Sequence, residues 1–224
     1  ILISGGTINV TSVSADVKAI KTGNNTITIN SGTFNLNVSG NASKAISAKG
    51  IITLNGGTYN INLSGAVVLT ASGSGYDPSY CTGIKSDVQI NVNGGNYTIQ
   101  ATSTATGGKG FSAGGIITIT NGTFNISTAA NGANYVNISG VADTYGAVAF
   151  SSNSDINISG GNFTLSNSGS DGKAISADGG INISGGTVGI SNSGATGKGL
   201  KSDGAITFNG GNTTINLSGA TVLN

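Results

Sequence analysis

Apolar and polar residues alternate in short runs along the whole chain, and three such runs recur in each repeat. Residues 181–184 read Ile-Asn-Ile-Ser, residues 58–63 read Thr-Tyr-Asn-Ile-Asn-Leu, and residues 44–48 read Lys-Ala-Ile-Ser-Ala. A period of two places successive side chains on opposite faces of a β-strand. Gly, Asn or Asp separates the runs, as at tight corners, and no window keeps a helical period. The pattern predicts three short strands per repeat and almost no helix.

Pairs of small residues that end in Gly mark the repeat. Successive pairs are 26, 25, 38, 27, 39, 25 and 25 residues apart: 5–6, 31–32, 56–57, 94–95, 121–122, 160–161, 185–186 and 210–211. Three strands and three corners make one turn of a solenoid, and neighbouring turns stack. We therefore expect an all-β, three-sided solenoid of about eight coils of about 25 residues. It forms one domain, residues 1–224, with loop insertions at about 64–82 and 128–146, where the period lengthens.

One column of aromatic residues is expected inside this solenoid. Its members each lie two residues before Ile or Leu: Phe34, Tyr59, Tyr97, Phe124 and Phe163. This spacing indicates a buried stack rather than a platform for sugars. Outward Thr, Asn and Ser can align as ladders between coils. The Thr and Asn array also raises ice binding as a function, although Asn interrupts a regular Thr grid.

The composition excludes several classes of chemistry. The chain has nine Lys, eight Asp and one Cys, and no His, Arg, Glu, Met or Trp. Without imidazole there is no Ser-His-Asp triad and no His-bound zinc, and one Cys makes no internal disulfide. We therefore expect no enzyme. A net charge of +1 without Arg argues against a nucleic-acid partner, and no run of 18 apolar residues predicts a membrane span.

The two insertions collect tyrosines and aspartates. The first contains Tyr76, Asp77 and Tyr80, and the second contains Tyr135, Asp143 and Tyr145. The insertions belong to coils two apart, so we expect their roots about 10 Å from each other on one face. Exposed Tyr rings stack on sugar C–H faces while Asp accepts from hydroxyls, which favours a carbohydrate site. The alternative is that the tyrosines hold long loops against the solenoid.

Acidic and amide side chains share one corner in successive coils. Asn153, Asp178 and Asp203 occupy this corner in three consecutive coils, and Asp155 lies two residues beyond Asn153. Stacked carboxylates repel unless a cation lies between them, and calcium takes six to eight oxygen ligands. The pattern therefore predicts a calcium site at these four residues. The alternative is a set of solvated turns, which Asp favours for its own backbone bonds.

Lysines recur at the start of the third run of most coils. They form one column with a second set three residues later: Lys18, Lys44, Lys109, Lys173 and Lys198, then Lys21, Lys85 and Lys201. A row of cations along a flat face can hold the carboxylates of an acidic polysaccharide. The alternative is that these lysines offset neighbouring aspartates and keep a charge-poor rod soluble.

The last two coils resemble a known family. Residues 172–187 read Gly-Lys-Ala-Ile-Ser-Ala-Asp-Gly-Gly-Ile-Asn-Ile-Ser-Gly-Gly-Thr, and residues 197–212 follow a similar pattern, Gly-Lys-Gly-Leu-Lys-Ser-Asp-Gly-Ala-Ile-Thr-Phe-Asn-Gly-Gly-Asn. Both are similar to the bacterial carbohydrate-binding β-helix proteins, which are secreted, calcium-binding, right-handed parallel β-helices. The resemblance implies binding of cellulose or of an acidic plant polysaccharide such as polygalacturonate, without hydrolysis, outside the cell or at its surface.

The corner motif of that family is only partly kept. It is intact at residues 201–204, Lys-Ser-Asp-Gly, and lost at Lys49, Gly114 and Asn153, which implies fewer metal sites than in the family. The same fold houses polysaccharide lyases, in which calcium acidifies a uronate proton and a basic side chain removes it. Lyase activity is disfavoured because the chain has no Arg to bind a substrate carboxylate.

A structural role is the main alternative to carbohydrate binding. A solenoid leaves two open ends, and neither end of this chain has an obvious cap. Rods that join end to end would form an extracellular fibre, so a homopolymer is a possible partner. Because the chain begins at Ile1 without an initiator Met, we also expect it to be part of a longer, processed protein.

Overall fold

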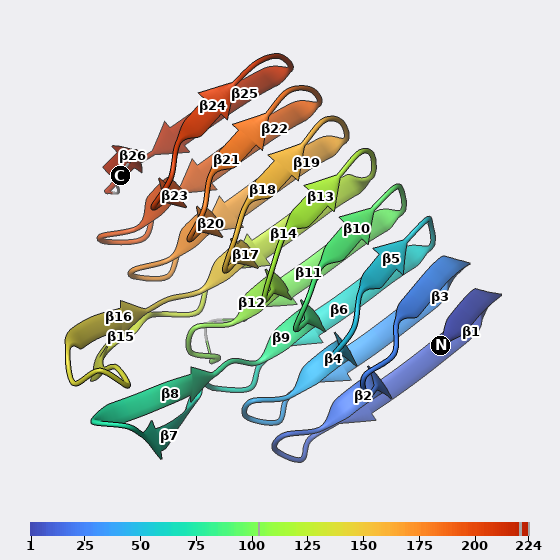
Figure 1. The fold of residues 1–224 in the computed structure, drawn as a ribbon, viewed down its shortest axis with the longest axis horizontal. Helices are drawn as coiled ribbons and strands as arrows, with labels where there is room; N and C mark the ends of the chain where they lie inside the picture. Colours follow the sequence, from blue (N-terminus) through green and yellow to red (C-terminus); the bar gives the residue numbers. More distant parts are fainter. Residues whose placement is uncertain (103, 220, 224) are drawn as a thin grey trace.

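The computed structural model describes every residue except 103, 220 and 224, and all the regular elements it describes are β-strands. The chain winds into a parallel β-solenoid of about eight turns with about 26 residues per turn (Figure 1). Each complete turn contributes one strand to each of three sides. The three-sided all-β solenoid that the repeat predicts is thus confirmed. Within the described residues, no helix is long and apolar enough to cross a membrane.

Two of the three sides belong to one 14-stranded sheet, because β3 (Ile27–Val38) pairs with a strand on each side. The first side contains β5 (Ile52–Leu54), β10 (Ile90–Val92), β13 (Ile117–Ile119), β18 (Ile156–Ile158), β21 (Ile181–Ile183) and β24 (Ile206–Phe208). The second side contains β1 (Leu2–Ser12), β6 (Thr58–Leu63), β11 (Asn96–Ala101), β14 (Thr123–Thr128), β19 (Asn162–Asn167), β22 (Thr187–Asn192) and β25 (Asn212–Leu217).

The third side is a separate eight-stranded sheet. Its strands are β2 (Lys18–Thr22), β4 (Lys44–Ala48), β9 (Thr82–Ser86), β12 (Lys109–Ala113), β17 (Val148–Ser152), β20 (Lys173–Ala177), β23 (Lys198–Ser202) and β26 (Thr221–Leu223). The remaining four strands form two antiparallel hairpins outside the solenoid: β7 (Val68–Ser72) with β8 (Gly75–Ser79), and β15 (Ala133–Val136) with β16 (Ala142–Tyr145). The hairpins lie where the repeat lengthens.

Equivalent residues of neighbouring coils pair in register, and their outward amides form ladders. Asn60 donates to Asn35 Oδ1 at 2.8 Å across 25 residues of sequence, and Asn35 donates to Asn9 at 2.7 Å. Where a hairpin intervenes the offset rises to 38 residues, as between Asn55 and Asn93. The register keeps every apolar alternate position inside, so the hydrophobic core is continuous along the rod.

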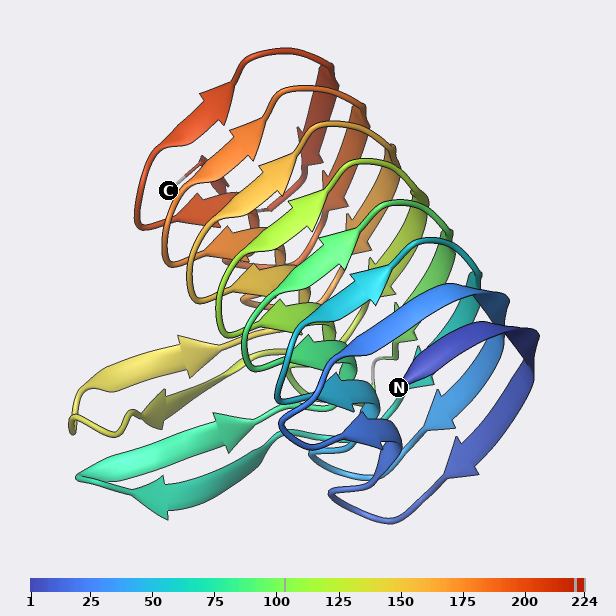
Figure 2. The same cartoon turned by 45° about the vertical axis from the view of Figure 1, so that its right-hand side comes forward.

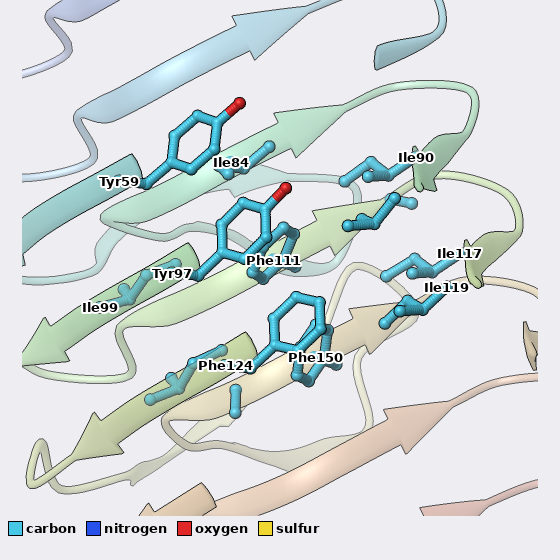
Figure 3. Packing of buried hydrophobic residues seen from close by; sticks show 14 of the residues in the cluster. Tyr59, Ile84, Ile90, Tyr97, Ile99, Phe111, Ile117, Ile119, Phe124 and Phe150 are labelled. Atoms are coloured by element: carbon cyan, nitrogen blue, oxygen red, sulfur yellow. The ribbon is translucent and has the colours of Figure 1, made fainter. Parts of the chain in front are cut away.

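The aromatic column that the sequence predicts forms one buried stack: Phe34, Tyr59, Tyr97, Phe124 and Phe163. Neighbouring ring centroids lie 4.5–4.9 Å apart, with planes 5–9° from parallel. Phe111 and Phe150 form a second stack, 4.8 Å apart, that meets the first edge to face (Figure 3). The Tyr97 hydroxyl donates to Gly94 O at 2.7 Å, so the buried phenol has a partner.

The small-residue pairs are explained by the stacking of corners. Gly186 has φ +84°, in the left-handed region that L side chains rarely adopt. A Cβ added there would lie 2.6 Å from Gly161 O in the preceding coil. Coils stacked this closely therefore require Gly at this corner.

The first and last coils leave part of the core open. Ile8 and Val10 at one end, and Ile206 and Ile215 at the other, pack on the core but are only partly buried. Phe208 in the last coil is 48% exposed. End-to-end assembly through these surfaces stays a prediction.

Candidate functional site

The two hairpins lie side by side and form one structure, which we call the flap (residues 68–79 and 133–145). Both leave the solenoid at the corner between the second and third sides (Figure 2). A parallel bridge pairs Tyr76 with Asn137, and Ser74 N donates to Ile138 O at 2.9 Å. Insertions that are far apart in sequence are thereby joined.

The outward face of the third side carries two rows of residues, which we call the lysine face. The first row opens each strand, and its members pair in register: Lys18, Lys44, Thr82, Lys109, Val148, Lys173 and Lys198. The second row lies three residues later: Lys21, Ser47, Lys85, Ser112, Ser151, Ser176 and Lys201. The register confirms the lysine column that the sequence predicts.

An open groove of about 1510 Å³ separates the flap from the lysine face. All nine lysines of the chain line it, with five of the eight aspartates. Its lining extends from Lys18 in the first coil to Lys201 in the seventh, so the groove follows the stack of coils. One side of the rod therefore carries every basic side chain of the protein.

Within the described part of the chain, the lysines at the centre of the groove form no ion pair with a carboxylate. The three central ammonium groups donate to neutral oxygens: Lys44 to Ser79 Oγ at 2.9 Å, Lys109 to Ser151 Oγ at 3.1 Å and Lys173 to Asp171 backbone O at 3.4 Å. Burial lowers the pKa of all three, and that of Lys109 falls to about 8. All three line the groove, where Lys44 is 5% exposed and Lys109 lies against the Tyr80 ring.

Three other lysines form ion pairs with an aspartate two residues away: Lys18 with Asp16, Lys85 with Asp87 and Lys201 with Asp203. All three aspartates are largely exposed, so each pair contributes little to stability. For these lysines the interpretation that they offset nearby acids fits the geometry. The lysine face therefore contains three lysines paired with aspartates and three central lysines that bond to neutral oxygens, besides Lys21 and Lys198.

The loop tyrosines line the groove from the flap, but they differ in exposure. The Tyr80 ring packs perpendicular to Tyr145 at 6.3 Å, and Lys109 Nζ lies 4.0 Å from its centre. The Tyr135 hydroxyl donates to Asp143 at 3.1 Å, and burial together with this bond raises the pKa of Tyr135 to about 12. Tyr76 is 44% exposed. Tyr80 and Tyr145 hold the flap to its base, whereas Tyr76 and Tyr135 face the groove with less cover.

The predicted metal residues stack but do not converge. The backbone amides of Asn153, Asp178 and Asp203 each donate to a carbonyl of the preceding coil. The acceptors are Ala113, Ser152 and Ala177, which occupy one repeat position, as the sequence predicts. Asp155 Oδ1 instead accepts from Gly180 N at 2.7 Å, and Asp203 pairs with Lys201.

Within the described residues, no three or more Asp, Glu, His or Cys side chains lie together as a group. Calcium binding stays a prediction from the sequence, which melting curves with and without a chelator would test.

The sequence predicts the tyrosine loops and the lysine column as two separate features. It does not predict that the flap lies over the lysine face. A signal was present, because each insertion directly precedes a strand of the lysine face, at Cys81 and at Ala147. Lys49 was also missed as part of the groove, since it lies at a corner outside both rows.

The fold and site define a class: a parallel β-solenoid with a lysine-lined groove beneath a flap. The sequence model of a family described as "carbohydrate-binding domain-containing protein" matches residues 1–132, which include the first hairpin. The chain belongs to this family. Comparison with curated proteins and with solved structures found no match for the chain.

Proposed function

We propose that the chain binds an acidic polysaccharide in the groove between the flap and the lysine face. The observation that carries this proposal is the gathering of all nine lysines along one open groove. Nine lysines against five aspartates leave the lining with an excess of four positive charges, and an excess of one sign in a cleft attracts a polyanion. Membership of a carbohydrate-binding family supports a polysaccharide as that polyanion.

The spacing of the charges suits an extended chain that runs along the rod. Neighbouring strands lie about 4.8 Å apart, so lysines of consecutive coils, such as Lys18 with Lys44 and Lys173 with Lys198, present positive charges about 4.8 Å apart. This distance is close to the length of one sugar unit in an extended polymer. A polyuronate could therefore place successive carboxylates over successive coils.

The flap supplies contacts that charge alone does not. Tyr76 and Tyr135 offer ring faces to sugar C–H groups, and Asp77 and Asp143 offer acceptors to hydroxyls. Tyr80 and Tyr145 position these residues by packing against the base of the flap. In this proposal the flap makes the groove select acidic polysaccharides over polyanions that contain no sugar rings.

The experiment is calorimetric titration with polygalacturonate, using neutral cellulose oligomers for comparison. We expect polygalacturonate to bind and the affinity to fall steeply with added salt, because exposed charges are screened. The triple variant Lys44→Gln, Lys109→Gln, Lys173→Gln should lose at least about tenfold in affinity if each unpaired lysine contributes a partly exposed ion pair.

The matched control is Lys85→Gln. Lys85 lies on the same face, but Asp87 already neutralises it, so this variant should change the affinity less than any one central substitution. Equal losses from Lys85→Gln and from Lys109→Gln would contradict the proposed site. Salt-independent binding of cellulose alone would contradict the acidic ligand.

A second candidate function is a lyase on uronates, and one observation favours it. A pKa of about 8 gives Lys109 a fraction of neutral amine near neutral pH, as a proton-abstracting base requires. Incubation with polygalacturonate would then generate unsaturated uronate, detected by its ultraviolet absorbance. We propose binding without cleavage and expect no such product.

We further propose that the protein acts outside the cell or at its surface, where such polymers occur. The ligand class supports this location. Fractionation of the source cells, followed by immunodetection, would test it.

A further inference from the structure

The row of lysines in the groove is interrupted at one coil. Coils one to four, six and seven each contribute at least one lysine to the groove, although the third coil has Thr82 in the first row and its Lys85 pairs with Asp87. The fifth coil, residues 117–155, has none, and the position paired with Lys109 and Lys173 is Val148. Ser151 occupies the second row there. A polymer that follows the row therefore crosses an uncharged stretch of floor.

Negative groups surround this interruption. The second hairpin leaves from the same coil and brings Asp143 into the groove lining, hydrogen bonded to Tyr135. Asp171 and Asp178 of the next coil also line the groove. The nearest cations of the first row are Lys109 and Lys173, one coil away on each side.

A carboxylate over the fifth coil would lose water without gaining a cation, which is costly. The Asp143 carboxylate, which also lines the groove, would repel it. An uncharged sugar has the opposite preference, because its C–H face can lie on the Tyr145 ring while its hydroxyls donate to Asp143 or bond to Ser151, and the Val148 side chain below is apolar and 5% exposed. The side chains on both sides of the groove therefore favour a neutral unit at this coil.

We propose that the groove over the fifth coil is a subsite for one uncharged sugar unit within an otherwise acidic chain. The ligand class is thus a polyuronate interrupted by a neutral or esterified unit. This inference rests on the proposed function, because it assumes that the polymer runs along the lysine face. Val148 is the residue that determines the specificity.

The experiment compares two oligogalacturonates of about seven units, long enough to span the lysine-bearing coils at one unit per coil. One is fully acidic, and the other carries a single internal methyl ester. We expect the wild type to bind the esterified oligomer about fivefold tighter, the size of effect expected for one unfavourable, partly exposed charge contact. Val148→Lys should reverse this preference.

Thr82→Lys is the matched control. Thr82 is the other uncharged member of the first row in coils one to seven, it is as buried as Val148, and its coil already contains one lysine, Lys85, which pairs with Asp87. This variant should raise the affinity for both oligomers alike. A second variant, Asp143→Asn, removes the opposing charge without a change in size, and it should weaken the preference for the ester even if Val148→Lys folds poorly.

Tighter binding of the fully acidic oligomer by the wild type would overturn the subsite while leaving the proposed function standing. Equal shifts in preference from Val148→Lys and Thr82→Lys would also overturn it. Binding of neither oligomer to the wild type would overturn the proposed function and the subsite together.

Discussion

Lys109 Nζ lies 4.0 Å from the centre of the Tyr80 ring. Lys109 opens β12 in the floor of the groove, and Tyr80 directly follows β8 of the flap. One cation–π contact therefore joins the floor of the groove to the flap. It links the position of the flap to the charge of the lysine face.

Replacing Tyr80 should loosen the flap without unfolding the solenoid. Tyr80→Ala removes the contact with Lys109 and the edge contact with Tyr145, which together stabilise the closed flap by about 1–3 kcal/mol. Amide hydrogen exchange in residues 68–79 should become faster, while exchange in the buried strands stays slow. Tyr80→Phe keeps both ring contacts and is the control, and faster exchange in that variant too would contradict a role for the ring.

The affinity for an acidic polysaccharide should fall as the pH rises from 7 to 9. Burial lowers the pKa of Lys109 to about 8, so this side chain loses its positive charge within that window. Titrations at constant ionic strength should show the loss in wild type and a flatter profile in Lys109→Met. An unchanged pH profile in that variant would show that other lysines govern the dependence.

The same pKa shift predicts the opposite trend for stability. An unburied Lys has a pKa of 10.5, so between about pH 8 and 10.5 the unfolded chain holds more protons at Lys109 than the folded chain. The free energy of unfolding contributed by this group therefore rises with pH across that window. Denaturant melts at pH 7.5 and 10, compared between wild type and Lys109→Met, measure the difference.

The aromatic stack should dominate the stability of the central coils. Tyr97 is fully buried between Tyr59 and Phe124, so Tyr97→Ala leaves a large cavity and should cost about 3–5 kcal/mol. Tyr97→Phe removes only the hydroxyl that donates to Gly94 O and should cost about 1 kcal/mol. Urea denaturation of both variants measures the two values, and similar losses would show that the hydroxyl rather than the ring matters.

The single thiol should be unreactive in the folded protein. Cys81 is fully buried where the first hairpin rejoins the solenoid, and burial raises the pKa of its thiol. Because the thiolate is the reactive form, a thiol reagent should label Cys81 only when the chain unfolds. Labelling at the rate of a free thiol under native conditions would mean that the hairpin root opens readily.

The sequence determined the fold to a large extent because a solenoid is encoded locally. Each coil repeats the same alternation, and stacking copies of one unit leaves few choices of register. The column of Phe34, Tyr59 and Tyr97 could therefore be aligned from spacing alone, as could the lysine column. Lengthened repeats also located the insertions, because extra residues must leave the coil.

The site depended on features that no local pattern encodes. The flap forms only because Tyr76 of one hairpin meets Asn137 of the other, 61 residues later in the sequence, and that contact joins two insertions with no shared motif. Its orientation over Lys44 and Lys109 follows from packing at the corner, which the period does not specify. Likewise, the repeat aligned Asn153, Asp178 and Asp203 and placed Asp155 two residues beyond Asn153. It did not give the directions of the side chains, and local contacts direct Asp155 to Gly180 N and Asp203 to Lys201. The repeat in the sequence thus determined which residues share a side of the rod, and the tertiary structure decided which of them face each other across the groove.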